Sequence, residues 1–119
     1  MGFTYAKVRL QNPVDLKKTH EIELLVDTGA IFSSIPRAIL QKLDLPSLER
    51  RKLRVYGGNI VEREVGGLVF EYGGTRAMAP VIFGEDKDTP VLGATALEAL
   101  GYQVDPVSKE LKPTELLML

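Results

Sequence analysis

The chain has 119 residues, a length typical of one domain, and a second independent core is not expected. Apolar residues make up 45% and charged residues 26%, which favours a globular domain over a disordered chain. The net charge of -1 gives no electrostatic reason to expect nucleic acid or an anionic membrane as a partner. The absence of Cys excludes disulfide scaffolds, thiol catalysis and Cys-based metal sites, and the single His20 excludes His-rich ones.

Signals for a membrane or for export are also missing. No apolar run approaches the roughly 20 residues of a membrane-spanning helix. Lys7 and Arg9 interrupt the apolar N-terminal stretch, which therefore differs from the apolar region of a signal peptide. We expect a soluble, cytoplasmic protein in which residues 1–119 form one domain.

Short β-strands separated by turn residues are the dominant pattern. Apolar and alternating stretches predict strands at residues 3–10, 20–26, 31–35, 50–56, 60–70, 77–83 and 90–92. Short helices are expected from Pro36 to about Leu43 and over residues 95–100, the second closed by Gly101. Gly57-Gly58-Asn59 predicts a hairpin turn, and Gly66-Gly67 a bulge or bend. We therefore expect a mostly β fold, a closed barrel or sandwich, with one or two short helices.

The C-terminal region combines a small hairpin with an apolar tail. Residues 102–104 and 109–111 are predicted to pair around Asp105-Pro106. The tail, residues 116–119, is apolar. It either packs as a last strand on its own core or pairs with a partner chain, because an apolar edge left open tends to find one.

One segment combines a strand end with a chemically useful side chain. Leu24-Leu25-Val26 is followed directly by Asp27-Thr28-Gly29-Ala30, which places a carboxylate at the end of an apolar strand. The small residues after it let the chain turn sharply and bring backbone amides close to the carboxylate. The plain alternative is an Asp that only closes a turn.

Two further segments that follow Asp27 in the chain add to this pattern. Tyr56-Gly57-Gly58 forms the expected hairpin tip, which taken alone would be an ordinary surface turn. Near the C-terminus, Val91-Leu92-Gly93 leads into the second short helix, which taken alone would be a simple strand–helix junction.

Together and in this order, the three segments resemble the retropepsin-like aspartic proteases, the retroviral-type family that also has cellular bacterial and archaeal members. The resemblance covers roughly residues 22–105 and implies a single-lobe acid protease fold. It also implies a site with no metal and no other cofactor. The implied roles are catalysis for Asp27, the active-site loop for Thr28, Gly29 and Ala30, the substrate-covering flap for Tyr56, Gly57 and Gly58, and support beneath the loop for Leu92 and Gly93.

The number of suitable carboxylates implies a second copy of the chain. An aspartic protease needs two Asp residues in one site, and of the six in this chain only Asp27 is followed by Thr-Gly. Asp88 is followed by Thr89-Pro90, and Pro lacks both the amide and the conformational freedom of Gly. The expected enzyme is a homodimer in which two Asp27 carboxylates activate a water that hydrolyses a peptide bond.

Two positions depart from the retroviral pattern. Ile31 and Ala94 stand where retroviral members commonly carry an Asp and an Arg that pair with each other. Both members of the pair are replaced together, so no buried charge is left without its partner. The grip on substrate and the strength of the dimer are therefore expected to differ from those of the viral enzymes.

The sequence offers candidates for the substrate pockets and more than one function. Apolar candidates for the pocket walls, each of which could instead belong to the core, are Ile31, Val55, Ile60, Val81 and Ile82. The favoured function is a homodimeric aspartic endopeptidase acting on a peptide or protein. One alternative is a non-catalytic dimeric binding or assembly module on the same fold, and another is an unrelated β domain in which Asp27 only closes a turn.

Overall fold

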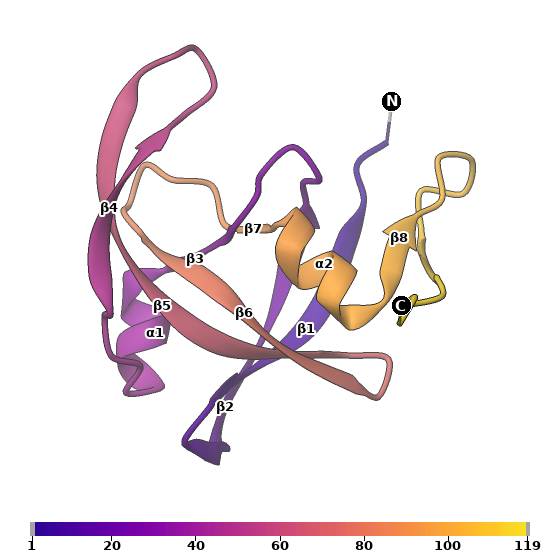
Figure 1. Ribbon diagram of the computed structural model, residues 1–119, viewed down its shortest axis with the longest axis horizontal. Helices are drawn as coiled ribbons and strands as arrows, with labels where there is room; N and C mark the ends of the chain where they lie inside the picture. Colours follow the sequence, from indigo (N-terminus) through magenta and orange to yellow (C-terminus); the bar gives the residue numbers. More distant parts are fainter. Residues whose placement is uncertain (1, 119) are drawn as a thin grey trace.

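The computed structural model describes residues 2–118, which form a mostly β structure with two short helices (Figure 1). This confirms the expected fold class. In chain order the elements are β1 (Tyr5–Asn12), β2 (Asp15–Val26), β3 (Ser33–Pro36), α1 (Arg37–Lys42), β4 (Glu49–Arg54), β5 (Ile60–Tyr72), β6 (Thr75–Gly84), β7 (Val91–Leu92), α2 (Ala94–Leu100), β8 (Tyr102–Val104) and β9 (Leu111–Pro113).

The main sheet closes on itself through its hydrogen-bonded neighbours. Its strand order is β1-β2-β7-β3-β6-β5-β4, and β1 also pairs with β5. Six strands therefore form a closed circuit, while β4 extends from β5 as an outer strand. Most neighbours are antiparallel, but β2 pairs with β7, and β3 with β6, in parallel. β4 pairs only with β5, so its other edge is open.

The first hairpin shows how alternation decides which side chains enter the core. Along β1, Ala6, Val8 and Leu10 are buried while the residues between them are exposed. The partner strand β2 begins at Asp15, five residues earlier than the apolar pattern predicted. Except for Leu16, its first residues are polar and extend beyond the core, so apolar alternation does not predict them.

The long strand β5 joins three neighbours. It pairs with β4 up to Val65, with β1 from Val69, and with β6 from Val65 to Tyr72. Its register with β6 runs unbroken through Gly66-Gly67, so of the bulge or bend predicted there, the bulge is absent. Gly66 is needed for another reason: a Cβ at this position would lie 2.8 Å from the carbonyl oxygen of Pro46.

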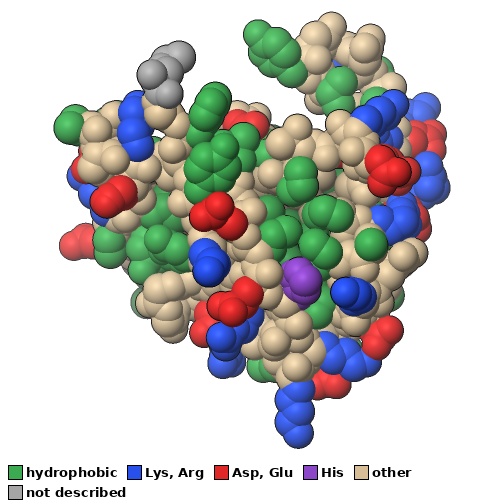
Figure 2. All heavy atoms as spheres, turned by 180° about the vertical axis from the view of Figure 1, so that it is seen from behind, with side chains coloured by type: hydrophobic (Ala, Val, Ile, Leu, Met, Phe, Trp, Pro, Cys, Tyr) green, Lys and Arg blue, Asp and Glu red, His purple; other side chains and the backbone are tan. Residues whose placement is uncertain are grey.

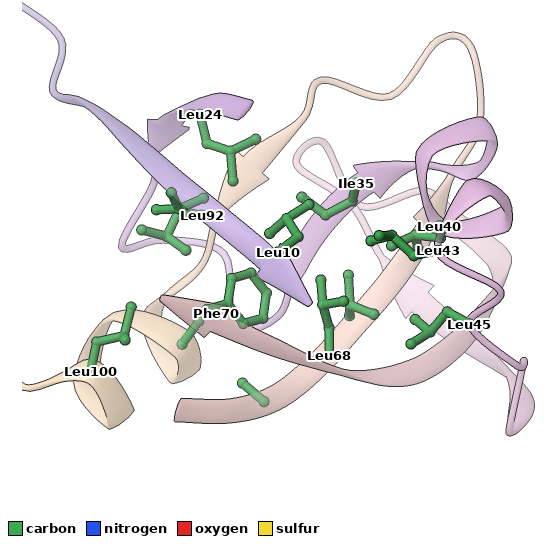
Figure 3. Packing of buried hydrophobic residues seen from close by; sticks show 14 of the residues in the cluster. Leu10, Leu24, Ile35, Leu40, Leu43, Leu45, Leu68, Phe70, Leu92 and Leu100 are labelled. Carbon is green, nitrogen blue, oxygen red and sulfur yellow. The ribbon is translucent and has the colours of Figure 1, made fainter. Parts of the chain in front are cut away.

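The core is built almost entirely from aliphatic side chains. Leu10, Leu24, Ile35, Leu68 and Leu92 are fully buried, and Phe70 is the one large aromatic ring among the fully buried residues described (Figure 3). On the side of the molecule that Figure 2 shows, apolar side chains at the surface are interspersed with charged ones.

Both helices begin and end where the sequence predicted, within a residue. Pro36 precedes α1, where its fixed φ suits a helix start. α2 ends at Gly101, whose φ of 80° lies in the left-handed region that favours Gly. No helix among residues 2–118 is long and apolar enough to cross a membrane.

The C-terminal residues leave the main sheet. β8 and β9 form a separate two-stranded sheet, and β9 begins at Leu111, two residues later than predicted. Tyr102 of β8 docks edge-on against Tyr72 at a ring distance of 4.9 Å. The tail that follows is not a core strand, since Leu117 and Met118 are 79% and 99% exposed. The first alternative, a last strand on the chain's own core, was therefore wrong for the described tail residues, and pairing with a partner chain stays a prediction; Leu119 lies outside the described residues.

A buried amide ties the first turn to the first helix. Asn12 is 3% exposed, and its side-chain N–H groups donate to the carbonyls of Leu43 at 2.7 Å and Asp44 at 3.3 Å. Its side-chain oxygen accepts from the N–H of Val14 at 2.9 Å. The side chain thus satisfies groups at the end of α1 and in the β1–β2 turn together.

We expect Asn12→Ala to lower the free energy of unfolding by about 2 kcal/mol, because buried backbone groups lose their partner. Urea unfolding measures the change. Lys17→Ala, at an exposed position of the same hairpin, serves as the control and is expected to stay within about 0.5 kcal/mol of wild type. Equal effects of the two substitutions would contradict this role of Asn12.

Candidate active site

Asp27 lies at the end of a strand that is held from both sides. Leu25 and Val26 of β2 pair with Val91 and Leu92 of β7. The N–H of Val26 donates to Thr4 at 2.8 Å, and the N–H of Asp27 donates to Leu92 at 3.0 Å. The last backbone hydrogen bond of this pairing therefore fixes the residue that carries the carboxylate.

A tight turn then orients the carboxylate. The Oδ1 of Asp27 accepts a hydrogen bond from the N–H of Gly29 at 2.9 Å, and the backbone carbonyl of Asp27 accepts one from the N–H of Ala30 at 3.1 Å. A Cβ on Gly29 would lie 3.2 Å from Oδ1, which crowds the carboxylate. Asp27, Thr28 and Gly29 are all exposed in the single chain. The carboxylate is thus held by the backbone and open to solvent.

The segment after β7 supports this loop from beneath. Two backbone N–H groups at the start of α2, those of Ala94 and Thr95, donate to Ala30 at 2.7 Å and Ile31 at 3.0 Å. α2 has no side-chain cap, so carbonyls of the Asp27 loop satisfy N–H groups that a helix leaves unpaired. The loop and the helix consequently hold each other in place.

Gly93 allows the segment after β7 to lie close to the backbone of Phe32. Its N–H donates to the Oγ of the fully buried Ser33 at 2.9 Å. A Cβ at Gly93 would lie 2.6 Å from both the carbonyl carbon and the oxygen of Phe32, a distance that real Cβ atoms essentially never show. Leu92 beside it is fully buried. The structure thus brings the predicted Leu92 and Gly93 into direct contact with the Asp27 loop.

The predicted flap residues lie at the tip of the β4–β5 hairpin. Tyr56 is fully exposed, and Gly57 and Gly58 have φ angles of 101° and 92°, which favour Gly. The turn is closed by hydrogen bonds between Val55 and Asn59 at 2.8 Å and between Gly58 and Val55 at 3.0 Å. In Figure 1 the hairpin projects toward the same end of the molecule as the loop after β2 and the loop between β6 and β7.

A cavity of about 430 Å³ lies between this hairpin and the body of the protein. Leu53, Val55 and Val61 of the hairpin and Ile82 of β6 line it. Asp27 does not line it, but β3, which follows the Asp27 loop, contributes Ser34.

The expected pocket walls are thus correct in part. Val55 and Ile82 line this cavity, as predicted. Val81 is fully buried in the core, whereas Ile31 and Ile60 are 69% and 58% exposed. Alternation along β6 explains the difference between Val81 and Ile82, since neighbouring side chains of a strand point to opposite faces.

An ion pair that sequence analysis missed forms one end of the cavity. Arg63 of β5, only 9% exposed, makes two hydrogen bonds to Asp88, with N–O distances of 2.8 and 3.0 Å. Asp88 also accepts from the N–H of Glu85 at 2.8 Å. The hydrogen bonds from Arg63 lower the pKa of Asp88, against the opposing effect of desolvation. Its only sequence signal was a cation between two acidic residues in a strand.

Comparisons with known proteins were made on the sequence and on the structure. A scan against protein-family models gives no match, and neither does a search of the curated proteins. Among solved structures, the chain is similar to the solution structure of the simian foamy virus (mac) protease, with a TM-score of 0.48, 18% identity, and coverage of 77% of this chain and 91% of that one. It is also similar to the crystal structure of a retropepsin-like aspartic protease from Rickettsia conorii, with a TM-score of 0.48, 20% identity, and coverage of 88% and 89%.

Both similarities are similarities of fold. Similarity of fold does not test the roles that the resemblance implies for individual residues. Thr28 is exposed in the single chain, so the bracing role that the resemblance implies for it stays a prediction. Among the described residues, no group of three or more His, Asp and Glu side chains is arranged to hold a metal ion.

We expect Gly93→Ala to lower the free energy of unfolding by about 3 kcal/mol, because its methyl group would overlap the backbone of Phe32. Gly67→Ala is the matched control, since a Cβ there meets nothing within 4 Å. Thermal and urea unfolding of both variants measure the difference. A Gly93→Ala chain as stable as the control would contradict the close contact between the two loops.

Asp88→Asn tests the ion pair through its pH dependence. The pKa of Asp88 is lowered in the folded chain, so its ionised form stabilises the fold above its ordinary value of 3.8, and this contribution disappears as the pH falls through the lower folded value. We expect the free energy of unfolding of the variant to be about 1.5 kcal/mol lower than that of wild type at pH 7. This difference in stability should narrow below about pH 4. Asp86→Asn, at an exposed neighbour, is the control. A gap that is constant with pH would contradict the ion pair.

Proposed function

We propose that residues 1–119 form one aspartic protease domain and that two copies assemble into a homodimeric endopeptidase. The observation that carries the proposal is the carboxylate of Asp27. It follows a buried strand, is oriented by the N–H of Gly29 at 2.9 Å, and remains exposed. A turn-closing Asp needs no such support, yet the N–H of Asp27 donates to Leu92, and α2 donates to Ala30 and Ile31 of the same loop.

The second acid of the pair comes from another copy. Asp88, the only other Asp followed by Thr, is engaged by Arg63 in two hydrogen bonds and is not available as a catalytic group. A two-fold axis beside Asp27 would bring two identical carboxylates together. Exposed apolar residues near both ends of the described chain favour a covering partner: Phe3, Leu116, Leu117 and Met118 are 71%, 67%, 79% and 99% exposed.

The chemistry follows from two carboxylates in contact. Because two negative charges so close repel each other, the pair retains one proton. The ionised member takes a proton from a water molecule, whose oxygen bonds to the peptide carbonyl carbon while the protonated member donates to the carbonyl oxygen. The carboxyl group that took the proton from water then gives it to the amine nitrogen as the carbon–nitrogen bond breaks, and the other carboxylate takes a proton from a hydroxyl of the intermediate, which restores the pair. The Thr28 hydroxyls of the two copies would brace the paired loops.

The hairpin and the cavity supply the peptide-binding surface. The Tyr56-Gly57-Gly58 tip can cover a bound peptide and exclude water. An extended peptide pairs its backbone as an added strand, and its side chains alternate between opposite sides. One of those side chains would enter the apolar cavity lined by Leu53, Val61 and Ile82.

We expect Asp27→Asn to lower kcat/KM for peptide cleavage by about a thousandfold or more, because the pair loses the carboxylate that activates water. Peptide cleavage is followed between pH 3 and 7, with Asp86→Asn as the control that keeps its activity. Activity that survives Asp27→Asn contradicts the proposal. A wild-type chain that dimerises but cleaves no peptide would favour the non-catalytic binding module.

A further inference from the structure

The strand β4 carries four cations whose positions differ. Side chains alternate along a strand, so Arg51 shares a face with Leu53 and Val55, while Arg50, Lys52 and Arg54 lie on the other face. Leu53 and Val55 line the cavity beneath the hairpin. The same face of β5 presents Arg63, which lies opposite Arg51 in the register and also lines the cavity. Arg51 is therefore the one cation of β4 on the side that faces the cavity.

The two arginines on this inner face are held in different ways. Arg63 is neutralised by Asp88. The guanidinium carbon of Arg51 lies 5.4 Å from the ring centre of Phe32, and among residues 2–118 no carboxylate lies within ion-pairing distance of it. An aromatic ring orients a cation without cancelling its charge. Arg51 is exposed and so keeps both its charge and its hydrogen-bond donors available.

The position of Arg51 places this charge beside the candidate catalytic loop. Phe32 stands five residues after Asp27, in the segment whose backbone packs on Gly93. Because Arg63 is already paired with Asp88, the guanidinium of Arg51 opposite it in the register is the cation that is left for an anion from outside the chain. Such an anion could accept two hydrogen bonds from the planar guanidinium.

We propose that Arg51 is a specificity-determining residue that binds an acidic side chain of the peptide substrate. The proposal rests on the proposed protease function, because it assumes that a peptide lies between the hairpin and the Asp27 loop. Cations on an open edge strand also discourage aggregation, but that purpose is already served by Lys52 and Arg54 on the outer face. Arg51 and Lys52 therefore form a matched pair of neighbouring cations on opposite faces.

Paired peptides test the proposal. A peptide that the wild-type enzyme cleaves is varied one position at a time, with Asp against Asn and Glu against Gln. We expect kcat/KM to be about three- to fivefold higher for the acidic peptide at one position, the range for a solvent-accessible ion pair. Arg51→Gln should remove this preference, Arg51→Glu should transfer it to a Lys-containing peptide, and Lys52→Gln should leave it unchanged.

Binding to the inactive Asp27→Asn chain separates this proposal from the protease function. Fluorescence anisotropy measures the affinity of the same acidic and amide peptides, with and without Arg51→Gln. If the wild type cleaves nothing but acidic peptides bind in an Arg51-dependent way, the function fails and the role of Arg51 stands. Cleavage or binding without an acidic preference, a preference lost equally in Lys52→Gln, or no peptide binding at all would overturn the role of Arg51.

Discussion

The arrangement around Asp27 depends on the close backbone contact between two loops that are distant in the sequence. Asp27 donates to Leu92, the N–H groups of Ala94 and Thr95 donate back into the Asp27 loop, and Gly93 lies against the backbone of Phe32. Each bond is ordinary by itself. Together they satisfy the start of α2 without a capping side chain and leave the carboxylate of Asp27 facing solvent. A loop held in this way can orient a reactive group more tightly than a free surface turn.

The hairpin above this loop is anchored at its base and open at its tip. Arg63 binds Asp88 in the loop between β6 and β7, and Arg51 stacks over Phe32 near Asp27. Both contacts join the arms of the hairpin to the segments that form the candidate site. At the tip, by contrast, a Cβ on Gly57 or Gly58 would meet nothing within 4 Å. The base therefore fixes the walls of the cavity, while the Gly residues of the tip project away from the rest of the chain.

Much of the fold follows from the sequence because alternation and turn residues act locally. The strands around Ile22–Val26, the Gly57-Gly58 turn and the helix that ends at Gly101 were all predictable for this reason. The polar start of β2 was not, since its residues pair with β1 without entering the core. Gly66 was misjudged as the site of a bulge, because the nearby Pro46 carbonyl that requires a Gly there is remote in the sequence.

In the candidate site, likewise, the local segments were predictable from the sequence and the contacts between distant residues were not. Asp27, Gly93 and the hairpin tip each carry a local signature, so their segments could be recognised one by one. No local pattern predicts the contacts between distant residues. The ion pair joins Arg63 to Asp88, 25 positions away, and the cation–π contact joins Arg51 to Phe32, 19 positions away. Such contacts arise only when the sheet has set its register, so the sequence predicted the two strands but not these partners.

The central claim is that each chain contributes one member of an acid pair. The most direct measurement is a crystal structure of the assembled protein at a pH where it cleaves peptides. We predict a two-fold dimer in which the Asp27 carboxylates of the two copies lie within hydrogen-bonding distance, about 2.5–3.0 Å between oxygens. A dimer whose Asp27 side chains face away from each other, or an active monomer, would contradict it.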